Sequence, residues 1–74
     1  MHQLPGEIDR RKFFRAMARL GWFVISTRGS HFKLANAITG RKIIVAVHDV
    51  IRRKATLAAL RQAGLTVEEF LEAL

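Results

Sequence analysis

Residues 28–48 read RGSHFKLANAITGRKIIVAVH, and this stretch decides the fold that we expect. Apolar side chains recur at every second position along two of its segments, which is the pattern of strands that bury one face. The pattern predicts one strand over residues 31–36 and another over residues 41–48. The four residues between them, AITG, have a suitable length for a hairpin turn.

The register of this hairpin follows from the side chains that it would bury. Pairing Phe32 with Val45 and Leu34 with Ile43 turns the apolar residues of both strands toward the same side. A shift of one residue would exchange the two faces, so the apolar pattern specifies the pairing. Five side chains are therefore expected to meet the helices: Phe32, Leu34, Ile43, Val45 and Val47.

The same register decides which side chains point away from the core. His31 and Lys33 fall on the open face, with His31 opposite Ala46 and Gly29 opposite His48. The sequence therefore predicts an exposed imidazole directly after a Gly-Ser pair, at the beginning of a strand.

The segment before the hairpin predicts a helix and a further strand. Asp9 precedes apolar residues that are spaced as one helical face, and Gly21 follows as a C-terminal cap, so we expect a helix over about residues 10–20. Its apolar face consists of Phe13, Phe14, Met17 and Leu20. Residues 22–27, WFVIST, are rich in β-branched and aromatic residues and are expected to form the first strand. Trp22 and the phenylalanines could stack on nucleic-acid bases only if they are exposed, and core packing is the more common role.

After the hairpin, residues 50–54, VIRRK, are expected to form an irregular, basic connection. A helix should follow, with Leu57 and Leu60 as its apolar contacts and Gly64 as its C-terminal cap. This helix would cover the sheet on the same side as the first one.

A short final helix is indicated by two capping signals. Thr66 and Glu69 match a capping box, and Leu65 and Phe70 occupy the positions of a hydrophobic staple. We expect this helix to close the core through Phe70, Leu71 and Leu74.

The element order is helix, three strands, helix and short helix. It predicts an α+β fold in which helices cover one face of a three-stranded antiparallel sheet, and it is also the order of a double-stranded-RNA-binding domain. A chain of 74 residues, 50% of them apolar, is large enough for one small core, so we expect residues 1–74 to form a single domain.

The charge of the chain is distributed unevenly. Up to Ala63 there are 13 basic and three acidic residues, a net charge of +10, whereas residues 64–74 contain three glutamates and no basic residue. Such a positive field attracts polyphosphate chains, which favours nucleic acid as a partner over a merely solubilising surface. Arg11, Arg15 and Arg19 form one stripe of the first helix, and this stripe fits a solvated face and a phosphate-tracking ridge equally well.

Several classes of protein are disfavoured by what the sequence lacks. It contains no cysteine, so neither a disulfide framework nor a thiolate zinc site is expected. No segment approaches the roughly 20 apolar residues of a membrane span, and the first residues do not resemble a secretion signal, so we expect a cytoplasmic protein. Asp49 is the single carboxylate near the candidate imidazoles, and no glycine-rich nucleotide-binding loop occurs, so we expect neither a metal nor a cofactor.

His31 is the principal candidate for catalysis. Histidine changes its charge near neutral pH and can take or give a proton, as is needed to cleave RNA with its own 2′-hydroxyl as nucleophile. Gly29 permits close approach of a phosphate, and Ser30 offers an N–H and a hydroxyl as donors. Arg28 and Lys33 could offset the charge on a pentacovalent phosphate. A lone histidine in a strand is, however, more often an ordinary surface residue.

His48 is a second candidate, since the expected register makes it a diagonal neighbour of His31. The two rings could divide the roles of general acid and general base. We favour the simpler interpretation that His48 ends its strand, and we exclude His2 because it lies at the N-terminus.

Four motifs in this order and spacing resemble the HicA mRNA interferase toxins of bacterial type II toxin–antitoxin systems, also called the YcfA-like family. They are ARLGW, RGSHFKL, RKIIVAVH and TLAALRQAGLTVEEFLEAL. The resemblance extends from about Ile8 to Leu74. The chain has Ala46 where the family commonly has proline, and Ala55 where it commonly has glycine before Thr-Leu.

The resemblance implies a double-stranded-RNA-binding-like fold and metal-independent ribonuclease activity on messenger RNA. It also implies that His31 is the catalytic residue and that a HicB-type antitoxin inhibits the toxin by covering its active face. Two other functions remain open at this stage. A non-catalytic RNA-binding module would use the same basic surface, and a protein-interaction domain would use it to bind an acidic partner.

Overall fold

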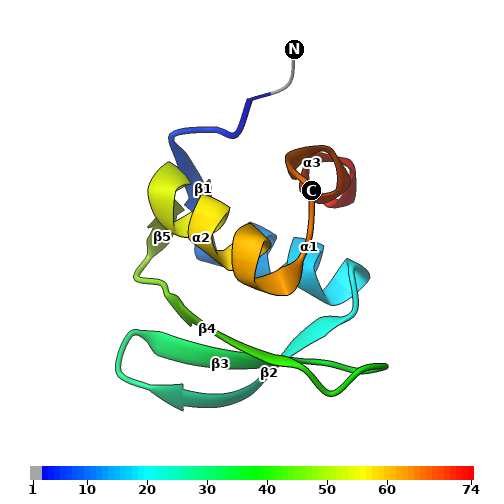
Figure 1. Cartoon of the computed structure of the whole chain (residues 1–74). Helices are drawn as coiled ribbons and strands as arrows, with labels where there is room; N and C mark the ends of the chain where they lie inside the picture. The colour runs from blue at the N-terminus through cyan, green and yellow to red at the C-terminus, as the bar shows by residue number, and fades with distance from the viewer. Residues whose placement is uncertain (1–2) are drawn as a thin grey trace.

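A three-stranded antiparallel sheet with the order β2-β3-β4 forms one layer of the molecule, and the helices lie over one of its faces (Figure 1). The computed structural model describes residues 3–74, so His2 lies outside the described residues. The sheet consists of β2 (Trp22–Arg28), β3 (His31–Asn36) and β4 (Lys42–Ala46). The helices are α1 (Arg10–Arg19), α2 (Arg53–Ala63) and α3 (Val67–Ala73). The chain therefore has the predicted α+β fold, which is similar to a double-stranded-RNA-binding domain.

The predicted hairpin register is confirmed over the length of β3 and β4. Phe32 pairs with Val45, Leu34 with Ile43, and His31 with Ala46. Of the five side chains that were predicted to meet the helices, Phe32 is partly buried and the other four are buried. The two strands thus hold His31 and Lys33 on the opposite, open face.

The predicted pairing of Gly29 with His48 is wrong. The pairing of β3 with β4 ends at His31 and Ala46, with one further bond in which the Val47 N–H donates to the Ser30 carbonyl (2.8 Å). Arg28 pairs with His31, so Gly29 and Ser30 are the two central residues of the turn between β2 and β3. Gly29 has φ +60°, a value that a type II′ turn requires at its first central residue.

Residues 50–54 do not form the expected irregular connection. β5 (Val50–Arg52) pairs with β1 (Glu7–Asp9) in a second, two-stranded antiparallel sheet, and α2 begins directly at Arg53. Ile8 and Ile51 lie opposite each other in this pair and are both buried. These strands are short and distant in sequence, so no local pattern reveals their pairing.

α1 begins and ends close to the predicted positions. The Asp9 carboxylate accepts hydrogen bonds from the backbone N–H groups of Arg11 (3.0 Å) and Lys12 (3.3 Å) and so caps the N-terminus. Leu20 is the C-cap, and Gly21, with φ +90°, follows it and leads into β2.

The buried face of α2 differs from the prediction in one residue. Thr56, Ala59, Leu60 and Ala63 are buried, at the i, i+3, i+4, i+7 spacing of one helical face. Leu60 is a core residue as expected, whereas Leu57 lies one position off that face and is 37% exposed. The Thr56 hydroxyl donates to the Arg52 carbonyl (3.1 Å), which satisfies the one polar side chain on this face.

The capping box of α3 is confirmed. The Glu69 N–H donates to the Thr66 hydroxyl (3.0 Å), and the Thr66 N–H donates to the Glu69 carboxylate (2.8 Å). Phe70 is fully buried and Leu71 is partly buried, but Leu74 is 40% exposed, so the prediction that Leu74 closes the core is wrong. Ala73 is buried instead, because it lies three residues after Phe70 on the same helical face.

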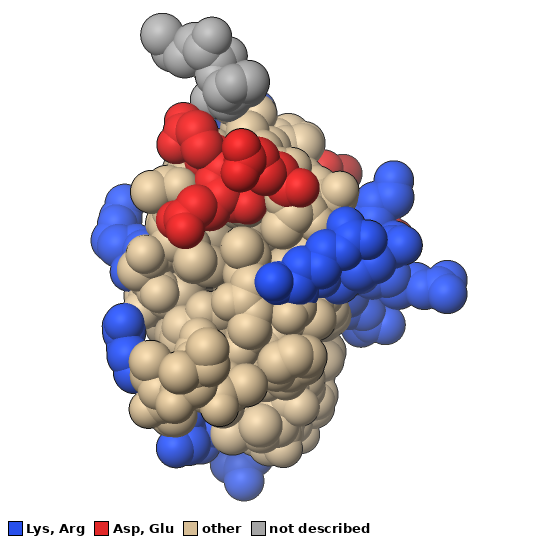
Figure 2. Space-filling model, turned by 90° about the vertical axis from the view of Figure 1, so that its right-hand side faces the viewer, with Lys and Arg blue, Asp and Glu red and all other residues tan. Residues whose placement is uncertain are grey.

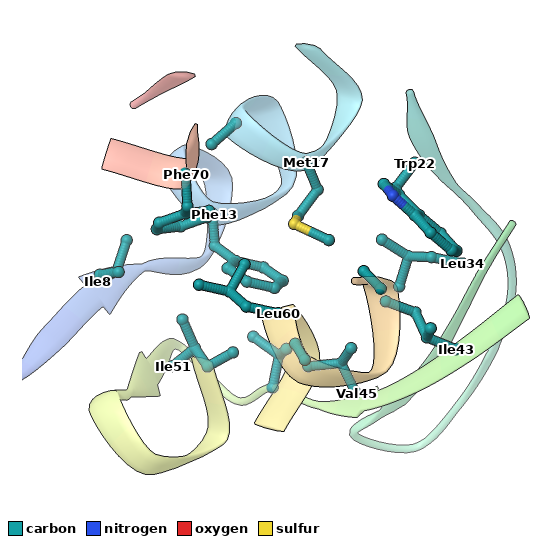
Figure 3. Close-up of a cluster of buried hydrophobic side chains, with 14 of the residues drawn as sticks. Ile8, Phe13, Met17, Trp22, Leu34, Ile43, Val45, Ile51, Leu60 and Phe70 are labelled. Atoms are coloured by element: carbon teal, nitrogen blue, oxygen red, sulfur yellow. The ribbon is translucent and has the colours of Figure 1, made fainter. Parts of the chain in front are cut away.

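The core lies between the sheet and the three helices (Figure 3). The rings of Phe13 and Phe70 are 5.8 Å apart, which ties α1 to α3. Trp22 is buried at the beginning of β2, in agreement with its predicted core role. Among the described residues, no helix has the length and apolar character that crossing a membrane requires.

Candidate nucleic-acid interface

The turn between β2 and β3 presents four of the candidate residues at one end of the sheet. Gly29 and Ser30 form the turn, and Arg28 and His31 face each other across it as the first cross-strand pair. A Cβ atom added to Gly29 would have no other group of the protein within 4 Å, so the space over this residue is open. An anionic group can therefore reach the backbone of the turn without displacing a side chain.

A shallow hollow of about 290 Å³ joins this turn to the beginning of α1. Its lining residues are Arg10, Gly29, Ser30, Val47, His48 and Asp49. Two backbone hydrogen bonds hold its walls together: the Val47 N–H donates to the Ser30 carbonyl, and the Arg10 N–H donates to the Asp49 carbonyl (3.2 Å). The structure thus brings His48 next to the Gly-Ser turn, although the two are not paired as strand residues.

The sequence does not indicate Arg10 as a residue of this site, because its position beside the turn depends on how α1 packs. It precedes the arginine stripe by one residue and has no distinguishing motif. In the folded chain it lines the same hollow as Gly29, Ser30 and His48. The one local signal was that Arg10 follows the predicted capping residue Asp9, which indicates a helix start but not what lies beside it.

The arginine stripe of α1 forms a separate basic surface. Arg11 and Arg15 line a hollow of about 560 Å³ with Asp9 and Lys12. A neighbouring hollow of about 470 Å³ is lined by Lys12, Arg15 and Arg19, together with Pro5, Glu7, Ile8, Asp9 and Leu74. Neither hollow includes His31 or the turn at residues 29–30.

The three predicted arginines are not equivalent in the structure. The Arg19 guanidinium donates a hydrogen bond to the Ala73 carbonyl (2.7 Å), which connects α1 to the end of α3. Arg11 and Arg15 make no side-chain hydrogen bond or ion pair within residues 3–74. Arg19 therefore has a structural contact, whereas the guanidinium groups of Arg11 and Arg15 are available to a ligand.

Apart from the exposed ion pair of Glu7 with Arg52 (3.3 Å), acidic and basic side chains gather on different parts of the surface. Figure 2 shows acidic side chains gathered near the top of the molecule, where α3 lies in Figure 1, and basic side chains projecting from its sides and base. Glu68 and Glu69 belong to the first turn of α3. In the part of the chain that the structure describes, no group of three or more histidine, cysteine, aspartate or glutamate side chains could hold a metal ion.

Comparison with known protein families identifies the class to which this fold and this surface belong. Residues 10–65 match the family described as HicA toxin of bacterial toxin–antitoxin systems. The chain belongs to this family, so the protein is the toxin of a toxin–antitoxin system and is expected to have an antitoxin as its partner. The matched region contains α1, the three-stranded sheet, the turn at residues 29–30 and α2. Comparisons with curated proteins and with solved structures returned no significant match.

Proposed function

We propose that this protein is a metal-independent ribonuclease that cleaves messenger RNA in the cytoplasm, with His31 as its general base or general acid. The observation that carries the proposal is the position of His31. It is exposed on the open face, pairs with Arg28 across the turn and directly follows the open backbone of Gly29 and Ser30. A proton-transfer group, a cation and free backbone donors are therefore adjacent.

The reaction that fits these groups uses the 2′-hydroxyl of the RNA itself. Its oxygen attacks the adjacent phosphorus and loses its proton to a base, and the bond from phosphorus to the 5′ oxygen breaks as that oxygen gains a proton. The products are a 2′,3′-cyclic phosphate and a 5′-hydroxyl. His31 would take the first proton or supply the second. The N–H groups at Gly29 and Ser30, with Arg28 and Lys33, would stabilise the negative charge that develops on the phosphate oxygens.

The basic surface of α1 would serve RNA binding rather than the chemical step. Arg11, Arg15 and Arg19 lie on α1, which packs on the covered side of the sheet, whereas His31 lies on the open side. We assign Arg11 and Arg15 to attraction and holding of the RNA backbone, which depends on charge and not on exact geometry. Arg19 adds its charge to this field, while its guanidinium stays bonded to the Ala73 carbonyl. A HicB-type antitoxin would inhibit the toxin by covering the face that carries His31.

The deciding experiment is cleavage of a defined messenger RNA by the purified protein in the presence of EDTA. We expect the native protein to cleave and His31→Ala to lose at least about 100-fold in rate, because general acid–base catalysis typically contributes 10² to 10⁴. Circular dichroism should show the same fold for both, since His31 is exposed. Lys54→Ala is a matched control, because it removes an exposed charged side chain on the first turn of α2 and should leave the rate unchanged.

Two outcomes would contradict this proposal. A folded His31→Ala protein that cleaves at the native rate would remove His31 from the mechanism. RNA binding by both proteins without cleavage in any buffer would instead indicate a non-catalytic RNA-binding module that uses the same basic surface.

A further inference from the structure

Nine residues on the open face of the sheet stand in three cross-strand rows. Residues directly opposite each other in neighbouring strands point to the same side of a sheet, so the register determines each row. A β-bulge between Val24 and Ser26 adds one residue to β2. After the bulge, Ser26 and Arg28 lie opposite Lys33 and His31. The rows are Phe23–Ala35–Lys42, Ser26–Lys33–Ile44 and Arg28–His31–Ala46.

This face combines exposed apolar groups with positive charge. Phe23 is 48% exposed and Ile44 is 53% exposed. Arg28, Lys33 and Lys42 are interleaved with them, and none of the nine positions carries an acidic side chain. No helix covers this side of the sheet, as Figure 1 shows. A ligand that matches the face must therefore offer both apolar surfaces and negative charges.

Phe23 takes no part in the aromatic contacts of the core. The preceding residue, Trp22, is buried in the core, and the aromatic contacts of the core join Phe13 to Phe14 and Phe70, and Phe14 to Phe32. The ring of Phe23 faces the opposite way and remains about half exposed. An aromatic ring in such a place can stack on a nucleic-acid base, whatever the base is, for about 1–3 kcal/mol per base.

The distance from Phe23 to His31 suits an RNA strand that runs across the three rows. Phe23 pairs with Ala35, which lies four residues from His31 along β3, or on the order of 13 Å at the strand rise of about 3.3 Å per residue. Lys33 lies between them on the same face. A base stacked on Phe23 would thus belong to a nucleotide near the bond that His31 cleaves but not at that bond.

We propose that the open face binds single-stranded RNA, with Phe23 as the stacking platform for one unpaired base and Lys33 and Lys42 as contacts to the phosphates beside it. A duplex buries the faces of its bases in its own stack, so only an unpaired base can lie on this ring. The inference rests on the proposed function in that RNA is the ligand, but it concerns binding and does not require cleavage. It makes Phe23 a specificity-determining residue that favours single strands.

Binding of a non-cleavable probe tests this inference with the complete native chain. The probe is a fluorescent 2′-O-methyl oligoribonucleotide, which lacks the attacking hydroxyl, either as a single strand or annealed to its complement. We expect the single strand to bind more tightly than the duplex. Phe23→Ala should weaken single-strand binding by about 5- to 150-fold, which corresponds to the stacking free energy of one base. Phe23→Trp, which restores a stacking surface, should retain the native Kd.

Two controls separate stacking from a general loss of apolar surface. Leu57→Ala removes an apolar side chain that is 37% exposed on α2, and it should leave RNA binding unchanged. The second control uses a set of probes, each of which lacks one base. With the native protein, binding should be weaker for the probe that lacks the base stacked on Phe23. With Phe23→Ala, that abasic probe and the intact probe should bind equally well. This second result identifies the base that lies on the ring.

The contrary outcomes distinguish a failure of the stacking proposal from a failure of the ribonuclease proposal. Native affinity of Phe23→Ala for the single strand, or equal binding of single strand and duplex, would overturn the stacking proposal. If Phe23→Ala lost affinity for the purified antitoxin while RNA binding was unchanged, the face would be a protein-docking surface instead. If binding of the probe depends on Phe23 but the native protein does not cleave messenger RNA, the ribonuclease proposal alone is contradicted. If the native protein cleaves messenger RNA but binding of the probe does not depend on Phe23, the stacking proposal alone is contradicted.

Discussion

The two faces of the three-stranded sheet come from the same strands but have different surroundings, and two neighbouring isoleucines show the difference most directly. Ile43 is 3% exposed on the covered face, and Ile44 is 53% exposed on the open face. The side chains are identical, and their backbones continue the same strand. What separates them is the strand's period of two, which turns one toward the helices and the other toward the ligand-accessible side. The covered face therefore carries stability, and the open face is free to carry function.

This comparison also shows why composition alone cannot assign the open face. Residues 43–47 are apolar throughout, a sequence typical of a strand buried on both faces. The structure nevertheless covers only one face. An apolar residue on the uncovered side, such as Ile44, thus becomes part of a surface that a partner can reach instead of part of the core.

The largest expected effect tests the comparison itself. Ile43→Ala should lower the free energy of unfolding by about 2–5 kcal/mol, because it removes buried methylene groups and leaves a cavity. Ile44→Ala should change it by no more than about 0.5 kcal/mol, because the side chain is already in contact with solvent. Urea unfolding followed by circular dichroism measures both values. Equal effects of the two substitutions would show that the open face is covered in solution.

A smaller effect is expected in the helical layer that forms the covered side. Arg19→Ala should cost about 1 kcal/mol, because it removes the partly buried hydrogen bond to the Ala73 carbonyl. Arg15→Ala, in the same helix but without such a bond, should stay within about 0.5 kcal/mol. Urea unfolding of the two variants under identical conditions distinguishes them, and an equal loss in both would remove the structural role that we give to Arg19.

The smallest expected effect on stability concerns the free edge of the sheet, along β4. The Gln62 side chain donates to the Ile44 carbonyl (3.5 Å) and accepts from the Ile44 N–H (3.4 Å), so it occupies part of the free edge of β4. Gln62→Ala should cost about 0.5 kcal/mol, since both bonds are long and exposed. Hydrogen exchange of the Ile44 amide should become faster. Arg61→Ala, at the adjacent exposed position, is the control and should leave that exchange unchanged.

The features predicted correctly from the sequence depend on residues that are close along the chain. The register of β3 and β4 follows from the alternation of apolar residues around a short turn, and the capping box at Thr66 follows from residues three apart. The N-terminal cap at Asp9 has the same local origin. The apolar alternation of β3 is therefore sufficient to place His31 on the open face.

The errors have the opposite origin. The pairing of β1 with β5 and the position of Arg10 beside the turn at residues 29–30 both depend on segments about 20 to 40 residues apart in sequence. The exposure of Leu57 depends on where the sheet lies relative to α2, which no helical period specifies. Such contacts are decided by global packing and leave no signal at short range.

The sequence by itself thus determined the fold class, the register of the hairpin formed by β3 and β4 and the side of the sheet on which His31 lies. Each of these follows from a local period, a cap or a turn. Only the tertiary structure decided that Arg10 and His48 line the hollow at the turn and that Arg19 is bound to α3. It also decided that Phe23 stands exposed in the row beyond Lys33. The physical reason is that a local pattern can orient a side chain relative to its own strand or helix, whereas its neighbours come from other segments that packing brings together.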